Sequence, residues 1–381
     1  MLRWRLLIGI PLVGLLVALC WLDAIAPIPG IVLMPFFLVC VYFLCKETLW
    51  LLNAGGIYPR RSTVYLSVFG TIILCWFACY NSLPIIVRLE NALATALQVQ
   101  SEKPQEAPLF QEPGKQASDP EKLNQATEAL IAAKQALENA LDAVRGGDGN
   151  ERGAEQASSE APAEVRVSSI SNEEAWKTAA YAGIHILLAI AAGVLIAFVG
   201  EMARFKQPGG NIINLMGAIF IIVYIGLLGS FMVMLRIAYG IMAVVSMIVV
   251  TKLCDIGAYT VGRLIGKHKM APSLSPGKTI EGACGGMLFA IFGAWFSTAV
   301  LFPLASGRPS QTTWLGIIVY GVAVGAAGAL GDLAESLIKR DVSRKDSGVN
   351  VPGFGGFLDI FDSLLVAAPV AFGLWAFHVI Q

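Results

Sequence analysis

The sequence has few charged residues, few histidines and no paired cysteine motif. Charged residues make up 14% of the 381 positions, against about 25% in ordinary soluble domains, which excludes a soluble globular protein. The three histidines are scattered and the seven cysteines form no CxxC pair, so zinc, Ser-His-Asp and histidine chemistry have no support. With 27 basic and 27 acidic residues the net charge is zero. Nothing favours a nucleic-acid partner, and we expect none.

Long uncharged runs take the place of the missing charge. Hydrophobic residues make up 56% of the chain and the mean hydropathy is +0.67. A helix needs about 20 residues to cross a bilayer core of about 30 Å. Suitable runs are 6–22, 24–45, 62–87, 178–200, 207–235, 237–251, 282–307, 309–331 and 363–381. They predict an all-α polytopic integral membrane protein with about nine transmembrane helices.

The first run resembles a signal peptide but has no small-x-small cleavage site, so we expect a retained helix. Basic residues predict the orientation, because short cytoplasmic loops are enriched in Lys and Arg. With the N-terminus inside, the inner side holds 16 basic residues, and the short outer loops hold only Arg236 and Arg308. We expect a cytoplasmic N-terminus, an outer C-terminus and, from the architecture, the inner membrane of a bacterium.

Residues 88–177 interrupt the apolar pattern. They are rich in Ala, Glu, Gln, Ser and Pro, with 16 acidic and nine basic residues. Within them, Glu121 to Val144 has apolar residues at a spacing of seven, which predicts a heptad helix of about three repeats. It could bind a partner or be solvated on all sides. The predicted organisation is three helices in 1–87, an extracytoplasmic insertion at 88–177, and six helices with cytoplasmic catalytic loops in 178–381.

Acidic residues of the membrane part gather near its C-terminus. Outside the insertion there are 11, and eight lie between 255 and 362: Asp255, Glu281, Asp332, Glu335, Asp341, Asp346, Asp359 and Asp362. Charge at a membrane is costly and marks function by default. We expect the last two inner loops to carry the functional site.

Two segments in this region suit phosphate and metal binding. Residues 252–282 combine glycines, which let a phosphate approach the backbone, with cations and hydroxyls. A basic inner loop with turn glycines and a helix starting at Ser275–Lys278 would give the same pattern.

The second segment, 331–362, has carboxylates at both ends. One helical face carries a carboxylate, a hydroxyl and cations: Asp332, Ser336, Lys339 and Arg340. Asp359 and Asp362 lie three residues apart where the last span begins. Carboxylates with basic residues between them favour an oxygen-ligated Mg²⁺ that bridges phosphate oxygens. Charges flanking a helix end would explain the basic residues but not the carboxylates.

The same segment contains the pattern Ser336-x-x-Lys339-Arg340-x4-Lys345-Asp346-x-Gly348-x3-Pro352-x-x-Gly355-Gly356-x-x-Asp359-x-x-Asp362. It resembles the signature of the phosphatidate cytidylyltransferases (CDP-diacylglycerol synthases). Asp255-x-Gly-Ala-Tyr259 and Ser275-Pro-x-Lys278-Thr279-x-Glu281-Gly282 are similar to upstream motifs of that family. The resemblance covers the membrane core, most firmly 250–381, and has no counterpart for 88–177.

The resemblance implies that phosphatidic acid attacks the α-phosphorus of CTP, giving CDP-diacylglycerol and pyrophosphate. It implies Mg²⁺ with accompanying K⁺, held by Asp332 and Asp359 with support from Asp362, and a homodimer in the bilayer. It implies phosphate contacts by Ser336, Lys339, Arg340 and Lys345. Nucleotide or lipid contacts would come from Ser275, Lys278 and Thr279, with Asp255 and Glu281 as acidic partners of unassigned role.

Two positions depart from the family pattern. Phe354 stands where the family usually has His, and Ile360 where it has Arg. Either these positions are peripheral, or the protein uses another lipid or has lost activity; the retained carboxylates favour an active enzyme. The alternatives are a CTP-dependent polyprenol or dolichol kinase, a catalytically lapsed paralogue or scaffold, and a transporter that uses carboxylates for ions.

Overall fold

The computed structural model describes residues 2–26, 28–82, 172–306, 310–345, 347–348 and 356–380. The chain divides into two compact units, one formed by Met1–Leu97 with Val167–Gln381 and the other by Gln98–Arg166. The predicted heptad helix at 121–144 falls in the second unit, outside the described residues. Every helix and strand named below belongs to the first unit.

The described residues form long helices and one small hairpin. In chain order the elements are α1 (Leu2–Ala24), α2 (Leu33–Ala54), α3 (Arg61–Ser82), α6 (Asn172–Arg204), α7 (Asn211–Ile221), η1 (Ile222–Leu227), α8 (Leu228–Tyr239), α9 (Ile241–Ile265), β1 (Lys269–Ala271), β2 (Ser275–Thr279), α10 (Ile280–Phe296), η2 (Ser297–Leu301), α11 (Phe302–Ser306), α12 (Trp314–Asp341) and α13 (Leu358–Ala376). The π-helical segments η1 and η2 continue the α-helices on either side of them.

Eight helical segments among the described residues are long and apolar enough to cross a membrane. They are Leu33–Ala54, Arg61–Asn81, Gly183–Arg204, Asn211–Tyr239, Ile241–Ile265, Ile280–Ala305, Trp314–Asp341 and Leu358–Ala376. Within α1, Gly14–Ala24 is a shorter apolar helix. Each of the nine predicted runs therefore overlaps a helix, and the prediction of an all-α polytopic membrane protein is confirmed.

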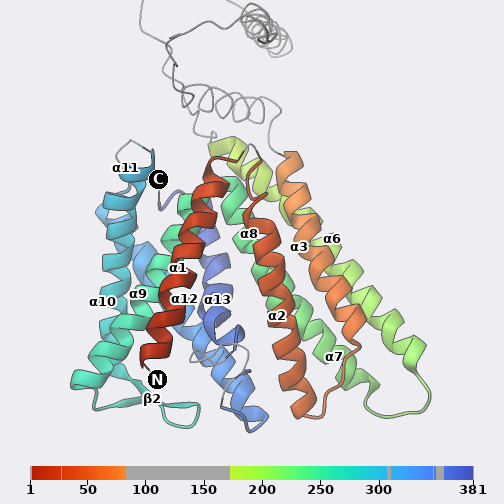
Figure 1. Cartoon of the computed structure of the whole chain (residues 1–381). Coiled ribbons are helices and arrows are strands. Elements are labelled where there is room, and N and C mark those ends of the chain that lie inside the picture. Colours follow the sequence, from red (N-terminus) through yellow and green to blue (C-terminus); the bar gives the residue numbers. More distant parts are fainter. Residues whose placement is uncertain are drawn as a thin grey trace, which may run out of the picture. The chain divides into compact units, whose positions relative to one another are not determined.

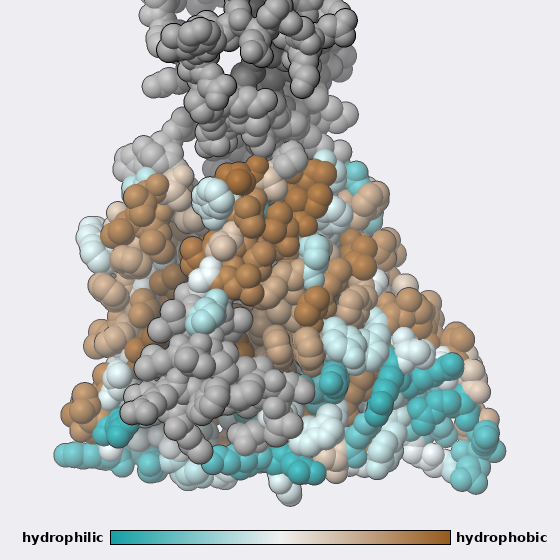
Figure 2. All heavy atoms as spheres, viewed as in Figure 1, coloured by the Kyte–Doolittle hydropathy of each residue, from teal (hydrophilic) through white to brown (hydrophobic). Residues whose placement is uncertain are grey.

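The two ends of the helical unit differ in polarity. Figure 1 shows the hairpin at the same end as the start of α1, and α11 at the other end; we call the first the hairpin end. Figure 2, in the same view, shows hydrophobic side chains over the middle and upper part of the visible face and hydrophilic ones gathered at the hairpin end. The helices alternate in direction as the sequence predicted, so the loops after α2, α6, α9 and α12 share the hairpin end.

Three helices run well past the ends of the predicted spans. α2 continues to Ala54 instead of ending at 45, α9 to Ile265 instead of 251, and α12 to Asp341 instead of 331. The segment Asp255–Tyr259 is therefore helical, and its placement in a loop was wrong. The prediction stopped at the first charged residue, whereas Lys252 pairs with Asp255 one turn later, at 3.4 Å, which lets the helix carry both charges.

The hairpin was also not predicted. Ser275–Thr279 is strand β2, paired antiparallel with β1, and not the start of a helix. α10 begins one residue later, at Ile280, because the Thr279 hydroxyl accepts a hydrogen bond from Gly282 N at 3.1 Å and caps the helix.

Small residues let the helices of the C-terminal half pack closely. α9 lies along α10, and α12 lies along α13. Gly331 on α12 faces the backbone of Asp362 and Ser363 on α13, and a Cβ at this position would lie only 3.1 Å from Ser363 Cα. Without a strong hydrophobic drive between helices in lipid, such close backbone approach is a main source of stability. It also brings the acidic residues of α12 and α13 together.

Candidate functional site

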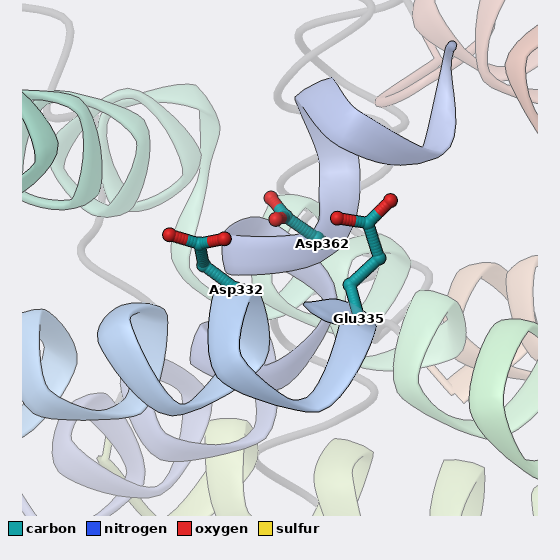
Figure 3. Close-up of side chains that lie close together, drawn as sticks. All are labelled: Asp332, Glu335 and Asp362. Atoms are coloured by element: carbon teal, nitrogen blue, oxygen red, sulfur yellow. The ribbon is translucent and has the colours of Figure 1, made fainter. Parts of the chain in front are cut away.

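Three carboxylates converge between α12 and α13. Asp332 and Glu335 lie on successive turns of α12, and Asp362 lies on the second turn of α13 (Figure 3). One oxygen from each lies within 4.8 Å of the others. Glu335 is 1% exposed and Asp362 is 4% exposed. We call these three residues the acidic cluster.

Each carboxylate of the acidic cluster is anchored through one oxygen. Lys278 Nζ lies 2.7 Å from Asp332 Oδ2, and Lys339 Nζ lies 2.5 Å from Glu335 Oε2. Asp362 Oδ1 accepts from the backbone N–H and hydroxyl of Ser363. In contrast, Glu335 Oε1 is buried and has no hydrogen-bond partner among the described residues.

The unpartnered oxygen bears on which ligand the acidic cluster could hold. Burying a polar group without a partner costs free energy, and an ionised carboxylate costs more. Three carboxylates this close also repel one another. A hard divalent cation with oxygen ligands would satisfy all three residues, so their donor set fits Mg²⁺.

Asp359 is held differently from the acidic cluster. Its Oδ1 lies 2.7 Å from Lys339 Nζ, and its Oδ2 accepts from Ser347 Oγ at 2.9 Å and from Gly356 N at 2.7 Å. Lys339 thus bridges Asp359 and Glu335. The structure brings together Asp332 and Asp362 of the three predicted metal ligands and surrounds Asp359 with donors. The metal role of all three residues stays a prediction.

Cations link the elements that surround the acidic cluster. Lys278 extends from β2 to Asp332 on α12. Lys252 on α9 donates to the carbonyl oxygen of Ile360 on α13 at 3.1 Å. Arg340 Nε donates to Leu274 O at 3.3 Å and so ties the end of α12 to the hairpin. Four segments distant in sequence therefore meet around the carboxylates.

The remaining predicted site residues lie on the same elements. Ser336 is half-buried on α12, and Lys345 is exposed just after that helix. Ser275 is half-buried opposite Ala271 in the hairpin, and Asp255 is half-buried on α9. Glu281 accepts from His268 Nδ1 at 2.6 Å and from backbone N–H groups, which closes the hairpin onto α10. Their contacts with nucleotide and lipid stay predictions.

Sequence reasoning missed one member of the acidic cluster and one residue near it. Glu335 was counted among the acids but given no role, although it follows Asp332 by three residues and so shares its helical face. Tyr224 lies in the π-helical segment η1, a geometry frequent at functional sites. Its hydroxyl is buried without a hydrogen-bond partner among the described residues, and Asp362, Glu335 and Asp332 act on it electrostatically. An apolar run gave no signal for it.

Comparison with known proteins shows the family to which the chain belongs. The profile of the cytidylyltransferase family matches residues 165–378, more than half of the chain. This chain belongs to the cytidylyltransferase family. The matched residues include the hairpin and all three residues of the acidic cluster, whereas α1, α2 and α3 precede them.

Several curated relatives are named phosphatidate cytidylyltransferase. That of Bacillus subtilis is 38% identical over 156 residues, which is 40% of this chain and 55% of the relative. That of Mycobacterium tuberculosis is 36% identical over 166 residues, 43% of this chain and 48% of the relative. That of Staphylococcus epidermidis is 43% identical over 121 residues, which is 31% of this chain and 43% of the relative. The chain spans about half the length of these family members.

Proposed function

We propose that the protein transfers a cytidylyl group from CTP to phosphatidic acid, giving CDP-diacylglycerol and pyrophosphate for phospholipid synthesis. The observation that carries the proposal is the acidic cluster with Lys278 and Lys339 bound to it, inside the segment matched by the family profile. The names of the relatives support the same substrates.

The acidic cluster would hold Mg²⁺ through Asp332, Glu335 and Asp362. Asp359 and an accompanying K⁺ would complete the metal site. A bound Mg²⁺ would neutralise charge on phosphate oxygens. Support comes from the unpartnered Glu335 Oε1 and from an all-oxygen donor set.

The protein's own residues would mainly bind and align the two phosphates, since phosphoryl-type transfer depends on positioning and charge neutralisation. Lys278, Lys339, Arg340 and Lys345 offer cations, and Ser275, Thr279 and Ser336 offer hydroxyls. A phosphate oxygen of the lipid forms a bond to the α-phosphorus of CTP. The bond from that phosphorus to the bridging oxygen breaks, and pyrophosphate leaves.

The position of the acidic cluster in the helical unit suits one lipid substrate and one soluble substrate. It lies on membrane-spanning helices toward the hydrophilic hairpin end, so a lipid headgroup and a soluble nucleotide can meet there. We assign the hairpin end to the cytoplasm of a bacterium, because most basic residues outside the insertion lie on that side. A homodimer in the inner membrane completes the proposal.

One departure from the family pattern lies beside the acidic cluster. Ile360 stands where the family pattern has Arg, and its backbone carbonyl oxygen accepts from Lys252 Nζ at 3.1 Å. The retained carboxylates, and not this backbone contact, support an active enzyme over a lapsed paralogue.

The test uses purified protein with Mg²⁺, with phosphatidic acid and a polyprenol as lipid acceptors, and with CTP labelled at either the α- or the γ-phosphorus. Cytidylyl transfer puts the α label into lipid and releases the γ label as pyrophosphate. A lipid kinase would put the γ label into a polyprenol. Neither label in lipid, despite folded protein, would contradict the proposal and favour a lapsed scaffold or transporter.

The negative control is Asp332→Asn, which removes one charge of the acidic cluster. Its matched control is Asp23→Asn, which changes another buried acid, on α1, whose carboxylate is paired with Arg236. Loss of α-label transfer only in Asp332→Asn assigns the activity to the acidic cluster.

A further inference from the structure

A further buried carboxylate at the hairpin end lies on a helix outside the family-matched segment. Glu47 on α2 is 2% exposed. Its Oε2 accepts a hydrogen bond from Leu358 N at 2.9 Å and from Ser347 Oγ at 3.3 Å. These partners lie about 300 residues further along the chain, in the loop before α13 and at its first residue.

Glu47 provides a cap that α13 does not have of its own. The first four N–H groups of a helix have no partner within it, and a side chain at the residue before the helix often supplies one. Phe357 occupies that position in α13 and makes no such bond. The Glu47 carboxylate bonds the N–H of Leu358 instead, and a negative charge is favourable at the positive end of the helix dipole.

The cap is connected to the acidic cluster by a series of hydrogen bonds. Ser347 Oγ contacts Glu47 and also Asp359 Oδ2, at 2.9 Å. Asp359 then bonds Lys339, and Lys339 bonds Glu335 of the acidic cluster. Groups that orient metal ligands from behind commonly form such series.

Glycines in the loop leave room for the Glu47 carboxylate. A Cβ at Gly348 would lie 2.8 Å from Glu47 Oε1, and one at Gly356 would collide with Glu47 and with Ser347 Oγ. These two glycines therefore lie directly against the Glu47 carboxylate, which indicates that its position is specific.

We infer that Glu47 is a positioning residue for the active site. It fixes the start of α13 and hence the places of Asp359 and Asp362, so that α2 is part of the catalytic unit although the family profile begins at residue 165. Glu47 acts through α13 and contacts neither substrate. The kinetic part of this inference rests on the proposed function.

The test compares Glu47→Ala with Asp23→Ala. Asp23 is the matched control because its carboxylate accepts from Val32 N and Leu33 N and so caps α2, at the opposite end of the unit. Both variants lose a buried cap. Only Glu47→Ala should lower kcat and weaken Mn²⁺ binding, each by about tenfold, as is typical for groups behind metal ligands. Glu47→Gln, which keeps an acceptor oxygen, should restore both values to within about threefold.

Two measurements separate this inference from the proposed function. Hydrogen exchange at residues 358–361 should be faster in Glu47→Ala than in wild type, and Mn²⁺ affinity is measured without substrate. If wild type forms no CDP-lipid, the proposed function fails while these two results still decide the role of Glu47. Should Glu47→Ala not fold, Glu47→Asp replaces it, since the shorter side chain withdraws the carboxylate from Leu358 N. Unchanged kcat, Mn²⁺ affinity and exchange in a folded variant would overturn the inference.

Discussion

Buried charge occurs at both ends of the helical unit, but the two groups are partnered very differently. Near the end opposite the hairpin, Asp23 is fully buried and lies 2.6 Å from Arg236 Nε. It also accepts from three backbone N–H groups, those of Gly30, Val32 and Leu33. Near the hairpin end, the acidic cluster gathers three carboxylates, and Glu335 Oε1 has no hydrogen-bond partner in the part of the chain that the structure describes.

The difference separates a structural ion pair from a candidate binding site. The Asp23–Arg236 pair has its hydrogen bonds made within the protein, so it needs no ligand and holds the loop between α1 and α2 against α8. The acidic cluster carries an electrostatic cost that a bound cation would relieve. Substitution should therefore affect stability at the first site and function at the second.

The largest effect is expected from Asp362→Asn in the acidic cluster. Asparagine keeps an oxygen that can accept from Ser363 but removes one negative charge. We expect cytidylyl transfer to fall by about 1,000-fold, the upper range for loss of one electrostatic group. The melting temperature in chelator should not fall, because a repulsive charge is removed. A variant that melts earlier and keeps its activity would reverse the assignment.

The opposite pattern is expected from Arg236→Met. It leaves Asp23 buried without its counter-ion, which should lower the free energy of unfolding by about 3 kcal/mol. The remaining folded protein should keep the specific activity of wild type. Thermal unfolding in detergent, followed by an activity assay of the folded fraction, measures both values. Loss of activity without loss of stability would mean that this pair also serves function.

A smaller effect distinguishes two buried tyrosines. Tyr320 OH bonds Ser246 Oγ at 2.8 Å, whereas Tyr224 OH has no partner among the described residues. Tyr320→Phe should therefore lower stability by about 1 kcal/mol and leave activity unchanged. Tyr224→Phe should leave stability unchanged or raise it, and lower activity about fivefold, since a free donor beside the acidic cluster can bond a substrate phosphate. Equal effects of both substitutions would remove the distinction.

The sequence predicted the helices and part of the site because both depend on local patterns. Apolar length sets the spans, and the spacing of Asp332 and Ser336, or of Asp359 and Asp362, is readable along one helix. The hairpin was missed because Ser275–Thr279 has no alternation of apolar and polar residues.

Other features depend on contacts between distant segments. Glu47 was not recognised because its partner Leu358 is 311 residues away. A single acid in an apolar run has no spacing to another polar residue that would indicate its partner. Asp359 and Asp362 have different hydrogen-bond partners although they are three residues apart. Which partners each one meets depends on the close approach of α12 and α13 at Gly331, and residue spacing along the chain does not predict that approach.

The measurement that tests the central claim most directly is Mn²⁺ binding to the purified protein, followed by electron paramagnetic resonance without substrate. The account predicts a site in wild type and in Arg236→Met, weakened at least about tenfold in Asp362→Asn. Equal Mn²⁺ affinity in wild type and Asp362→Asn would contradict the claim that the acidic cluster is a cation site.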